Sequence, residues 1–197
     1  MGCFGSNCSF NSRSFSRSNA NTGIDKEVDG QVEPFRAAIE LLSGIPGISQ
    51  LSARVLVSEI GIDMSRFETA SHLVSWAGLC PRNDESAGKR RSTRMRKGAP
   101  WLKTTLIQGA WAAARTKGIY FQTQDHRLRS RRGSKEAIGA VAAALLTTAY
   151  HMLKNGTLYQ DLGPNHFDQQ ANAKQVSRLI NRLENLGFEE QISLKAA

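Results

Sequence analysis

The stretch Ala137-Ile138-Gly139-Ala140-Val141-Ala142-Ala143-Ala144-Leu145-Leu146-Thr147-Thr148-Ala149 is the longest apolar run in the chain. Its 13 residues are too few to cross a bilayer, which takes about 20 apolar residues in a helix. The run lies within an Ala- and Leu-rich segment, 136–154, that Asn155-Gly156 closes. Strong helix formers followed by this stop signal predict an α-helix over the segment.

Further helices are predicted upstream and downstream of this one. Residues 99–117 form the second strong candidate, with Pro100 near the start and Gly118 after the end. Residues 24–43 carry apolar side chains at helical spacing, and Pro34 is expected to restart that helix. Shorter helices are predicted at 50–60, 70–77 and 175–186. Leu51, Val55 and Ile60 are expected to face inward, as are the three tryptophans Trp76, Trp101 and Trp111.

No segment alternates convincingly with a period of two, so the predicted fold is mainly α. Residues 1–22 hold six Ser and four Asn and predict a disordered, low-complexity tail. Residues 23–168 are expected to form one helical domain, with a helix-hairpin-helix at about 36–60. Residues 169–197 are expected to hold a last helix and a tail.

Composition excludes several protein classes. The chain has 197 residues, 40% of them apolar, which suits one domain with a real core. Cys3, Cys8 and Cys80 form neither a disulfide framework nor a zinc motif. The first six residues match a myristoylation pattern, which we interpret as a chance match in a biased tail. There is no signal peptide pattern, and a reducing, cytoplasmic, nucleoid-associated setting with no membrane contact is expected.

The charge is concentrated in one block. The chain has 26 Lys and Arg against 17 Asp and Glu, a net charge of +9. Residues 82–135 hold 15 cations and 3 acids, a net of +12, and the rest holds 11 against 14, a net of −3. A block of this kind is typical of a surface that faces a polyanion such as nucleic acid. The alternative is a solvated surface that only aids solubility.

The densest part of this block is an exposed basic loop or hairpin predicted at 84–97. It carries six cations in nine residues, and Arg side chains suit bidentate contacts with phosphate. These candidate phosphate-binding residues are Lys89, Arg90, Arg91, Arg94, Arg96 and Lys97. A second cluster comprises Arg127, Arg129, Arg131, Arg132 and Lys135. The alternative for both is an ordinary solvated surface.

Ile45-Pro46-Gly47-Ile48 separates two predicted helices and has the apolar-Gly-apolar form of a helix-hairpin-helix turn. In such a turn, amide groups at the start of the second helix can bind a phosphate of the DNA backbone. Gly47, Ile48 and Ser49 are therefore candidate contacts, with Ser49 standing where many such turns have a second Gly. An ordinary pair of antiparallel helices is the alternative.

Ser86 lies beside Gly88 and the dense cations of 89–97. A hydroxyl in this setting could attack a phosphodiester, with the cations stabilising the transition state. The alternative is an ordinary loop serine. No metal site is predicted: the four histidines lack ligand spacing, and local capping explains Asp161 and Asp168 better than a two-metal site does.

Several motifs in this order resemble one known family. They are Ile45-Pro46-Gly47-Ile48 through Ala53, Glu59-Ile60-Gly61, Arg66-Phe67, Trp76-Ala77-Gly78-Leu79-Cys80-Pro81-Arg82, Ser86-Ala87-Gly88-Lys89, Lys97-Gly98 with Trp101-Leu102, and Asn155 through Gly163. Over about residues 30–168 the chain resembles the C-terminal domain of the insertion-sequence-110 type transposases, relatives of the Piv DNA invertases.

The resemblance implies a composite active site. Family members join an N-terminal RuvC-like domain, which carries a DEDD metal site for Mg²⁺, to a helical C-terminal domain that supplies a nucleophilic Ser. A structured guide RNA from the same element directs them. Ser86 matches the Ser of the family's Ser-Gly-Gly-Lys-like stretch, and Ala87 replaces a common Gly. The resemblance thus implies DNA, and a structured RNA, as partners.

Low-complexity residues stand where the RuvC-like domain is expected. The chain therefore resembles a truncated, frameshifted or split copy, which we expect to bind DNA or RNA alone without recombining DNA. A homo-oligomer or an assembly with full-length transposase is expected, since recombining two duplexes needs several subunits. The alternative function is a non-catalytic nucleic-acid-binding module or a regulator of full-length transposase.

Overall fold

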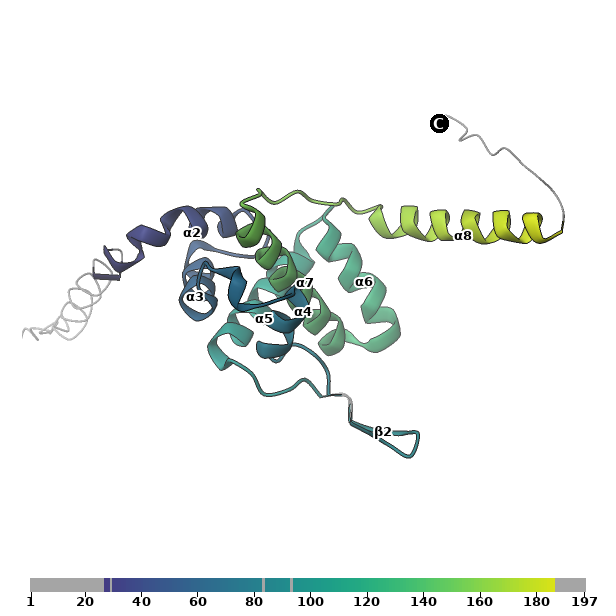
Figure 1. The fold of residues 1–197 in the computed structure, drawn as a ribbon, viewed down its shortest axis with the longest axis horizontal. Coiled ribbons are helices and arrows are strands. Elements are labelled where there is room, and N and C mark those ends of the chain that lie inside the picture. Colours follow the sequence, from purple (N-terminus) through teal and green to yellow (C-terminus); the bar gives the residue numbers. More distant parts are fainter. Residues whose placement is uncertain (1–26, 29, 83, 93, 187–197) are drawn as a thin grey trace, which may run out of the picture.

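The computed structural model describes residues 27–28, 30–82, 84–92 and 94–186, and most of them are helical (Figure 1). The tail expected at 1–22, with Cys3 and Cys8, lies outside the described residues. In chain order the elements are η1 (Glu33–Phe35), α2 (Arg36–Ser43), α3 (Gln50–Ile60), η2 (Met64–Arg66), α4 (Ala70–Trp76), β1 (Asp84–Ser86), β2 (Lys89–Ser92), α5 (Pro100–Arg115), α6 (Tyr120–Arg132), α7 (Ser134–Asn155) and α8 (His166–Asn185). The prediction of a mainly α fold is confirmed.

Helix α7 lies at the centre of the body, in contact with α2, α4, α5 and α6. Its alanines and Gly139 let neighbouring helices approach closely, while Val141, Leu145 and Leu146 fill the space between them. Gly156 ends the helix in the left-handed conformation. The apolar run that begins at Ala137 is thus the middle of the core.

Among the described helices, α7 is also the one that is long and apolar enough to cross a membrane. Its full length is 22 residues, longer than the apolar run within it. Within its most apolar window, 56% lies buried inside the protein. This burial against other helices is typical of the core helix of a globular domain.

The turn between α2 and α3 is pressed against α5 through two glycines. Gly47 has a left-handed backbone (φ 89°), and a Cβ on it would overlap the carbonyl oxygen of Gly109. A Cβ on Gly109 would in turn lie 2.9 Å from the carbonyl oxygen of Gly47. Ile45 and Ile48, on either side of Gly47, are buried. The close backbone contact therefore anchors this turn in the core.

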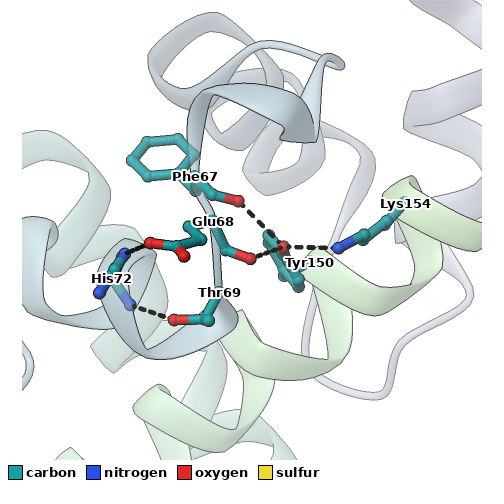
Figure 2. Close-up of polar contacts among 6 residues, drawn as sticks. All are labelled: Phe67, Glu68, Thr69, His72, Tyr150 and Lys154. Atoms are coloured by element: carbon teal, nitrogen blue, oxygen red, sulfur yellow. Dashed lines mark hydrogen bonds and ion pairs between the residues drawn. The ribbon is translucent and has the colours of Figure 1, made fainter.

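Tyr150 ties α7 to the segment between η2 and α4 (Figure 2). Its hydroxyl lies 3.0 Å from the carbonyl oxygen of Phe67 and 3.3 Å from that of Glu68, and it donates its proton to them. Lys154 donates to the same hydroxyl oxygen at 3.3 Å. Thr69 caps α4 by accepting from the amide of His72. This buried tyrosine therefore fixes the start of α4 on the core.

Helix α6 is the element that the sequence pattern did not predict. Its 13 residues include four arginines, and Phe121 is its buried apolar residue, so its helical periodicity is weak. Tertiary contacts stabilise it instead. Asp161 accepts from the first amide of α6, at Tyr120 (3.2 Å), and from the Tyr159 hydroxyl (2.8 Å). Local capping is expected of Asp161 from the sequence. It accepts from the nearby amide of Gly163 (3.2 Å), but the helix that it caps lies far away in sequence.

The structure corrects three further expectations. All three tryptophans are exposed rather than in the core: Trp76 is 46%, Trp101 74% and Trp111 37% exposed. Leu51 is 71% exposed, because it lies off the face of α3 that Ala53, Leu56 and Val57 bury. The last helix begins at His166 instead of near 175, and α8 extends away from the body (Figure 1) with none of its residues buried.

Candidate nucleic-acid interface

Residues 80–97 form an arm that projects from the body (Figure 1). Its outer part is an antiparallel hairpin in which Ser86 pairs with Lys89 and Glu85 with Arg90. Ala87 (φ 52°) and Gly88 (φ 73°) make the turn. Two left-handed residues in succession give a two-residue turn that matches the twist of the strands. The predicted basic loop or hairpin is therefore a hairpin.

The base of the arm is tightly joined to the body. The amide of Arg82 donates to the carbonyl of Arg94 (2.9 Å), and the amide of Arg96 donates to that of Cys80 (3.3 Å). Gly78 and Gly98 bring their backbones together so closely that a Cβ on Gly78 would lie 2.8 Å from the Gly98 nitrogen. Met95 contacts α7 where Gly139 leaves space. The hairpin thus projects from a fixed base.

Ser86 is the last residue of β1 and is exposed at the tip of this arm. Lys89 lies directly opposite on β2. The acids Asp84 and Glu85 precede Ser86 on the same strand, and Asp84 lies 3.9 Å from Arg82. The exposed hydroxyl is therefore open to an incoming polymer and sits beside cationic residues.

The candidate phosphate-binding cations all belong to the arm. Lys89, Arg94, Arg96 and Lys97 are exposed, and the backbone of Arg90 and Arg91 runs along β2. Figure 1 places this arm apart from α2 and α3. The structure thus groups Ser86 with the cations, but not with the α2–α3 turn.

At the α2–α3 turn, the three candidate residues have different surroundings. Gly47 packs on α5 and Ile48 is buried, so both face the interior. Ser49 is exposed and caps α3, because its hydroxyl accepts from the amide of Ser52 at 3.2 Å. The first amides of a helix have no acceptor within it. The surface that this turn offers to an anion is therefore the capped start of α3.

The second predicted cluster lies on and just after α6, where its members divide between two sides of the helix. The guanidinium carbon of Arg127 lies 5.5 Å from the ring centre of Phe167 at the start of α8. Arg129 lies over Trp111 of α5 at 6.0 Å and pairs with Asp125 at 2.6 Å. Within the described residues Asp125 is the one buried charged residue, at 1% exposure.

Sequence reasoning missed the exposed tryptophans of α5 as surface residues. Their helical phase could have revealed them, since Leu102, Leu106, Ala110 and Ala113 define the buried face. Trp101 and Trp111 fall on other positions of the helix. A tryptophan outside the apolar stripe of an amphipathic helix is expected at the surface rather than in the core.

The described residues contain no group of three or more His, Cys, Asp and Glu that could hold a metal. The arm itself can offer a hydroxyl and a positive field.

Comparison with known proteins places these features in context. Residues 39–126 match the family described as Transposase IS116/IS110/IS902. The chain is 30% identical over 131 residues to an insertion element IS110 uncharacterized 43.6 kDa protein of Streptomyces coelicolor, covering 63% of this chain and 31% of that relative. It is 32% identical over 123 residues to a pilin gene-inverting protein of Moraxella lacunata, covering 61% and 37%. A putative transposase y4rJ of Sinorhizobium fredii is 30% identical over 127 residues, covering 61% and 31%. The chain spans about a third of the length of these relatives.

Proposed function

Since the chain belongs, through residues 39–126, to the Transposase IS116/IS110/IS902 family, we propose that it acts in DNA transposition or recombination. In this proposal the domain binds DNA through its cationic block and presents Ser86 as the nucleophile of a composite active site. Relatives named as a transposase and as pilin gene-inverting proteins support this choice of reaction.

The observation that carries the proposal is the position of Ser86 on the arm. Ser86 is exposed, directly opposite Lys89, on a hairpin whose base is fixed to the core. A nucleophile at the tip of a projecting hairpin can enter an active site formed by another domain. The arm cations would hold the phosphates on either side of the scissile bond.

In this proposal Ser86 carries out the first step of a phosphoryl transfer, the attack on phosphorus. Its Oγ forms a bond to phosphorus, the bond from phosphorus to the departing sugar oxygen breaks, and the DNA becomes joined to the protein as a phosphoserine ester. The proton of the hydroxyl goes to a base and the departing oxygen receives a proton. The proposal assigns this proton transfer to groups of the partner domain.

DNA is the proposed partner of both the arm and the α2–α3 turn. We assign the turn as a helix-hairpin-helix in which Ser49 and the first amides of α3 meet a backbone phosphate. Gly47 and Ile48 act there through packing. A structured RNA offers the same phosphates, and a second copy of the chain would provide the second nucleophile that two duplexes require. Both are included in this proposal as partners.

The test is the formation of a covalent protein–DNA product. The chain is combined with nicked DNA substrate, Mg²⁺, structured RNA and a separately produced RuvC-like domain of the family, and products are resolved under denaturing conditions. Ser86→Ala should abolish the adduct. Ser92→Ala is the matched control, because it removes a hydroxyl from the other strand of the same hairpin, and it should leave the adduct intact.

An adduct that survives Ser86→Ala would overturn the catalytic role. If the same variant also kept its affinity for DNA, the remaining function would be that of a nucleic-acid-binding module or a regulator of full-length transposase. Binding measured on the same samples by fluorescence anisotropy separates the two functions.

A further inference from the structure

Helix α5 has one face that is exposed along its whole length. After Pro100, its exposed residues fall on one side of the helix, as positions three or four apart do, and they are Trp101, Thr104, Gln108, Trp111, Ala112 and Arg115. The first and last of them are separated by about 21 Å along the helix axis. No residue of α5 is acidic. Trp101 is 74% exposed, so most of its ring is open to solvent and to a ligand.

Two arginines are held at the far end of this face. The guanidinium carbons of Arg115 and Arg129 lie 5.9 Å and 6.0 Å from the ring centre of Trp111. A guanidinium over an indole ring keeps its N–H groups at the edge, where they can still donate to a phosphate. The ring of Trp111 thus supports two cations, and the ring of Trp101 remains open.

Asp125 holds Arg129 in place through an ion pair. Its carboxylate is 1% exposed and lies 2.6 Å from a terminal nitrogen of Arg129, and its Oδ1 has no hydrogen-bond partner in the described structure. A buried carboxylate with so few partners is costly unless a cation stays beside it. It therefore holds the Arg129 side chain over Trp111 before any ligand arrives.

We propose that the exposed face of α5, together with Arg129, binds unpaired nucleotides of a nucleic acid strand. Trp101 stacks on a base, and Arg115 and Arg129 contact phosphates further along the strand. An aromatic platform beside cations is the usual composition of a single-strand site. A duplex keeps its base faces stacked inside and cannot offer one to Trp101.

Charge favours nucleic acid over a protein as the occupant. The face lies within residues 82–135, whose net charge is +12 from 15 cations and 3 acids, and the acid that contacts Arg129, Asp125, is buried and paired. A nucleic acid strand offers phosphates and bases together at regular spacing, which matches cations beside the open face of Trp101. This site does not require the nucleophile Ser86, so it goes beyond the proposed reaction.

The experiment uses tryptophan fluorescence. The full chain has three tryptophans, and Trp76→Phe leaves Trp101 and Trp111 as the emitters. This protein is titrated with a 12-nucleotide oligothymidylate, the matching oligouridylate and a 12-base-pair duplex. The single strands should quench the emission, and the duplex should not. Binding of either the DNA or the RNA strand supports the proposed site, and the strand that binds more tightly shows which nucleic acid is the natural ligand.

Substitutions then test the individual residues. Trp101→Ala should weaken single-strand binding roughly tenfold, the effect of losing one stacked base. Arg115→Ala should weaken binding and make it less sensitive to salt, while the quenching at saturation remains. Leu51→Ala is the matched control, since it truncates an equally exposed apolar residue on α3, and should change nothing. Thermal melting shows that each variant is folded.

Two results would overturn the proposal: quenching by the duplex equal to that by the single strands, or single-strand affinity unchanged in Trp101→Ala. The arm variant Arg94→Ala with Arg96→Ala serves as the separating control. It should weaken duplex binding and leave the quenching by single strands intact, so that failure of the DNA-binding arm and failure of this site are distinguishable.

Discussion

At the scale of single residues, backbone conformation at a few positions shapes the candidate site. Ala87 is the one residue other than glycine, among those described, whose φ is positive, at 52°. A Cβ in this conformation clashes with the following carbonyl, which costs about 1 to 2 kcal/mol. The resemblance to the family placed a glycine here. In this chain the hairpin turn has the conformation that glycine favours, but alanine occupies the position, so the backbone is strained there.

Ala87→Gly should therefore make the arm more rigid. The closed arm should gain about 0.5 to 1 kcal/mol of stability. This is the strain that glycine relieves, reduced by the conformational entropy that glycine loses when the arm closes. Hydrogen–deuterium exchange of the amides on β1 and β2 measures it, because the arm can open without the core. Ala112→Gly, on the exposed face of α5, is the control and should destabilise the protein by about 1 kcal/mol. Faster exchange in Ala87→Gly would contradict this explanation.

Gly47 should tolerate no side chain, for a different reason. Besides its positive φ, an added Cβ would overlap backbone atoms of α5 that cannot move away. Gly47→Ala is expected to cost roughly 3 kcal/mol, the sum of backbone strain and overpacking. The measurement is the free energy of unfolding from urea denaturation.

Gly118→Ala isolates the packing effect. Gly118 has a similar φ of 78°, but nothing lies within 4 Å of its added Cβ. The Gly118→Ala variant should therefore lose only about 1 to 2 kcal/mol of folding free energy, the cost of the backbone strain alone. Equal losses in the two variants would show that the contact between Gly47 and Gly109 does not stabilise the fold.

At the scale of elements, the sequence predicted those helices whose own residues determine them. The bounds of α3 are those predicted, because the Ser49 cap and Gly61 mark both ends. α5 and α7 follow from long apolar stripes between Pro and Gly signals. By contrast, α6 depends on Asp161 from a distant loop, and a contact of this kind leaves no local signal.

The candidate site was predictable only where it depends on local sequence. The cations of the arm and Ser86 follow from composition and resemblance, since charged side chains are rarely buried in any fold. The inward orientation of Gly47 and Ile48 did not follow, because it depends on where α5 passes. The same holds for Trp111, whose arginine neighbours come from two helices.

The loop that holds α6 should weaken in alkali. Burial, and the hydrogen bond that the Tyr159 hydroxyl donates to Asp161, raise the pKa of Tyr159 above its ordinary value of 10.0. Folding thus favours the neutral phenol. Its contribution to stability is complete below pH 10.0 and is lost as the pH rises further, because the unfolded chain ionises first.

Tyr159→Phe should accordingly show a shallower decline of stability above pH 10.0. At neutral pH it should lose about 1 kcal/mol with the hydrogen bond. Urea denaturation at a series of pH values gives both quantities. Asp161→Asn, which keeps an acceptor but removes the charge, should fall between the two proteins. Parallel pH profiles in all three would rule out Tyr159 as the titrating group.

At the scale of the whole molecule, the structure separates a packed scaffold from a cationic surface. The residues outside 82–135 have a net charge of −3, and they include α2, α3, α4 and most of the core around α7. The cations of residues 82–135 belong to the arm, to α5 and to α6, together with Lys117 between these helices and Lys135 on α7. Because acids are scarce in this stretch, positive charge is concentrated on these elements, as binding to a polyanion requires.

This separation makes duplex binding strongly dependent on salt. If about six phosphates are contacted, the affinity should fall by about a thousandfold between ~50 and ~200 mM salt, because each contact releases counterions. Arg94→Ala and Arg96→Ala should each make the slope shallower by about 0.9 in log units of affinity per log unit of salt. Arg36→Ala is the control: Arg36 lies on α2, outside the block, and pairs with Glu33 at 2.8 Å. Its slope should match that of the unchanged protein. An affinity that does not vary with salt would mean that the cations of residues 82–135 do not contact the nucleic acid.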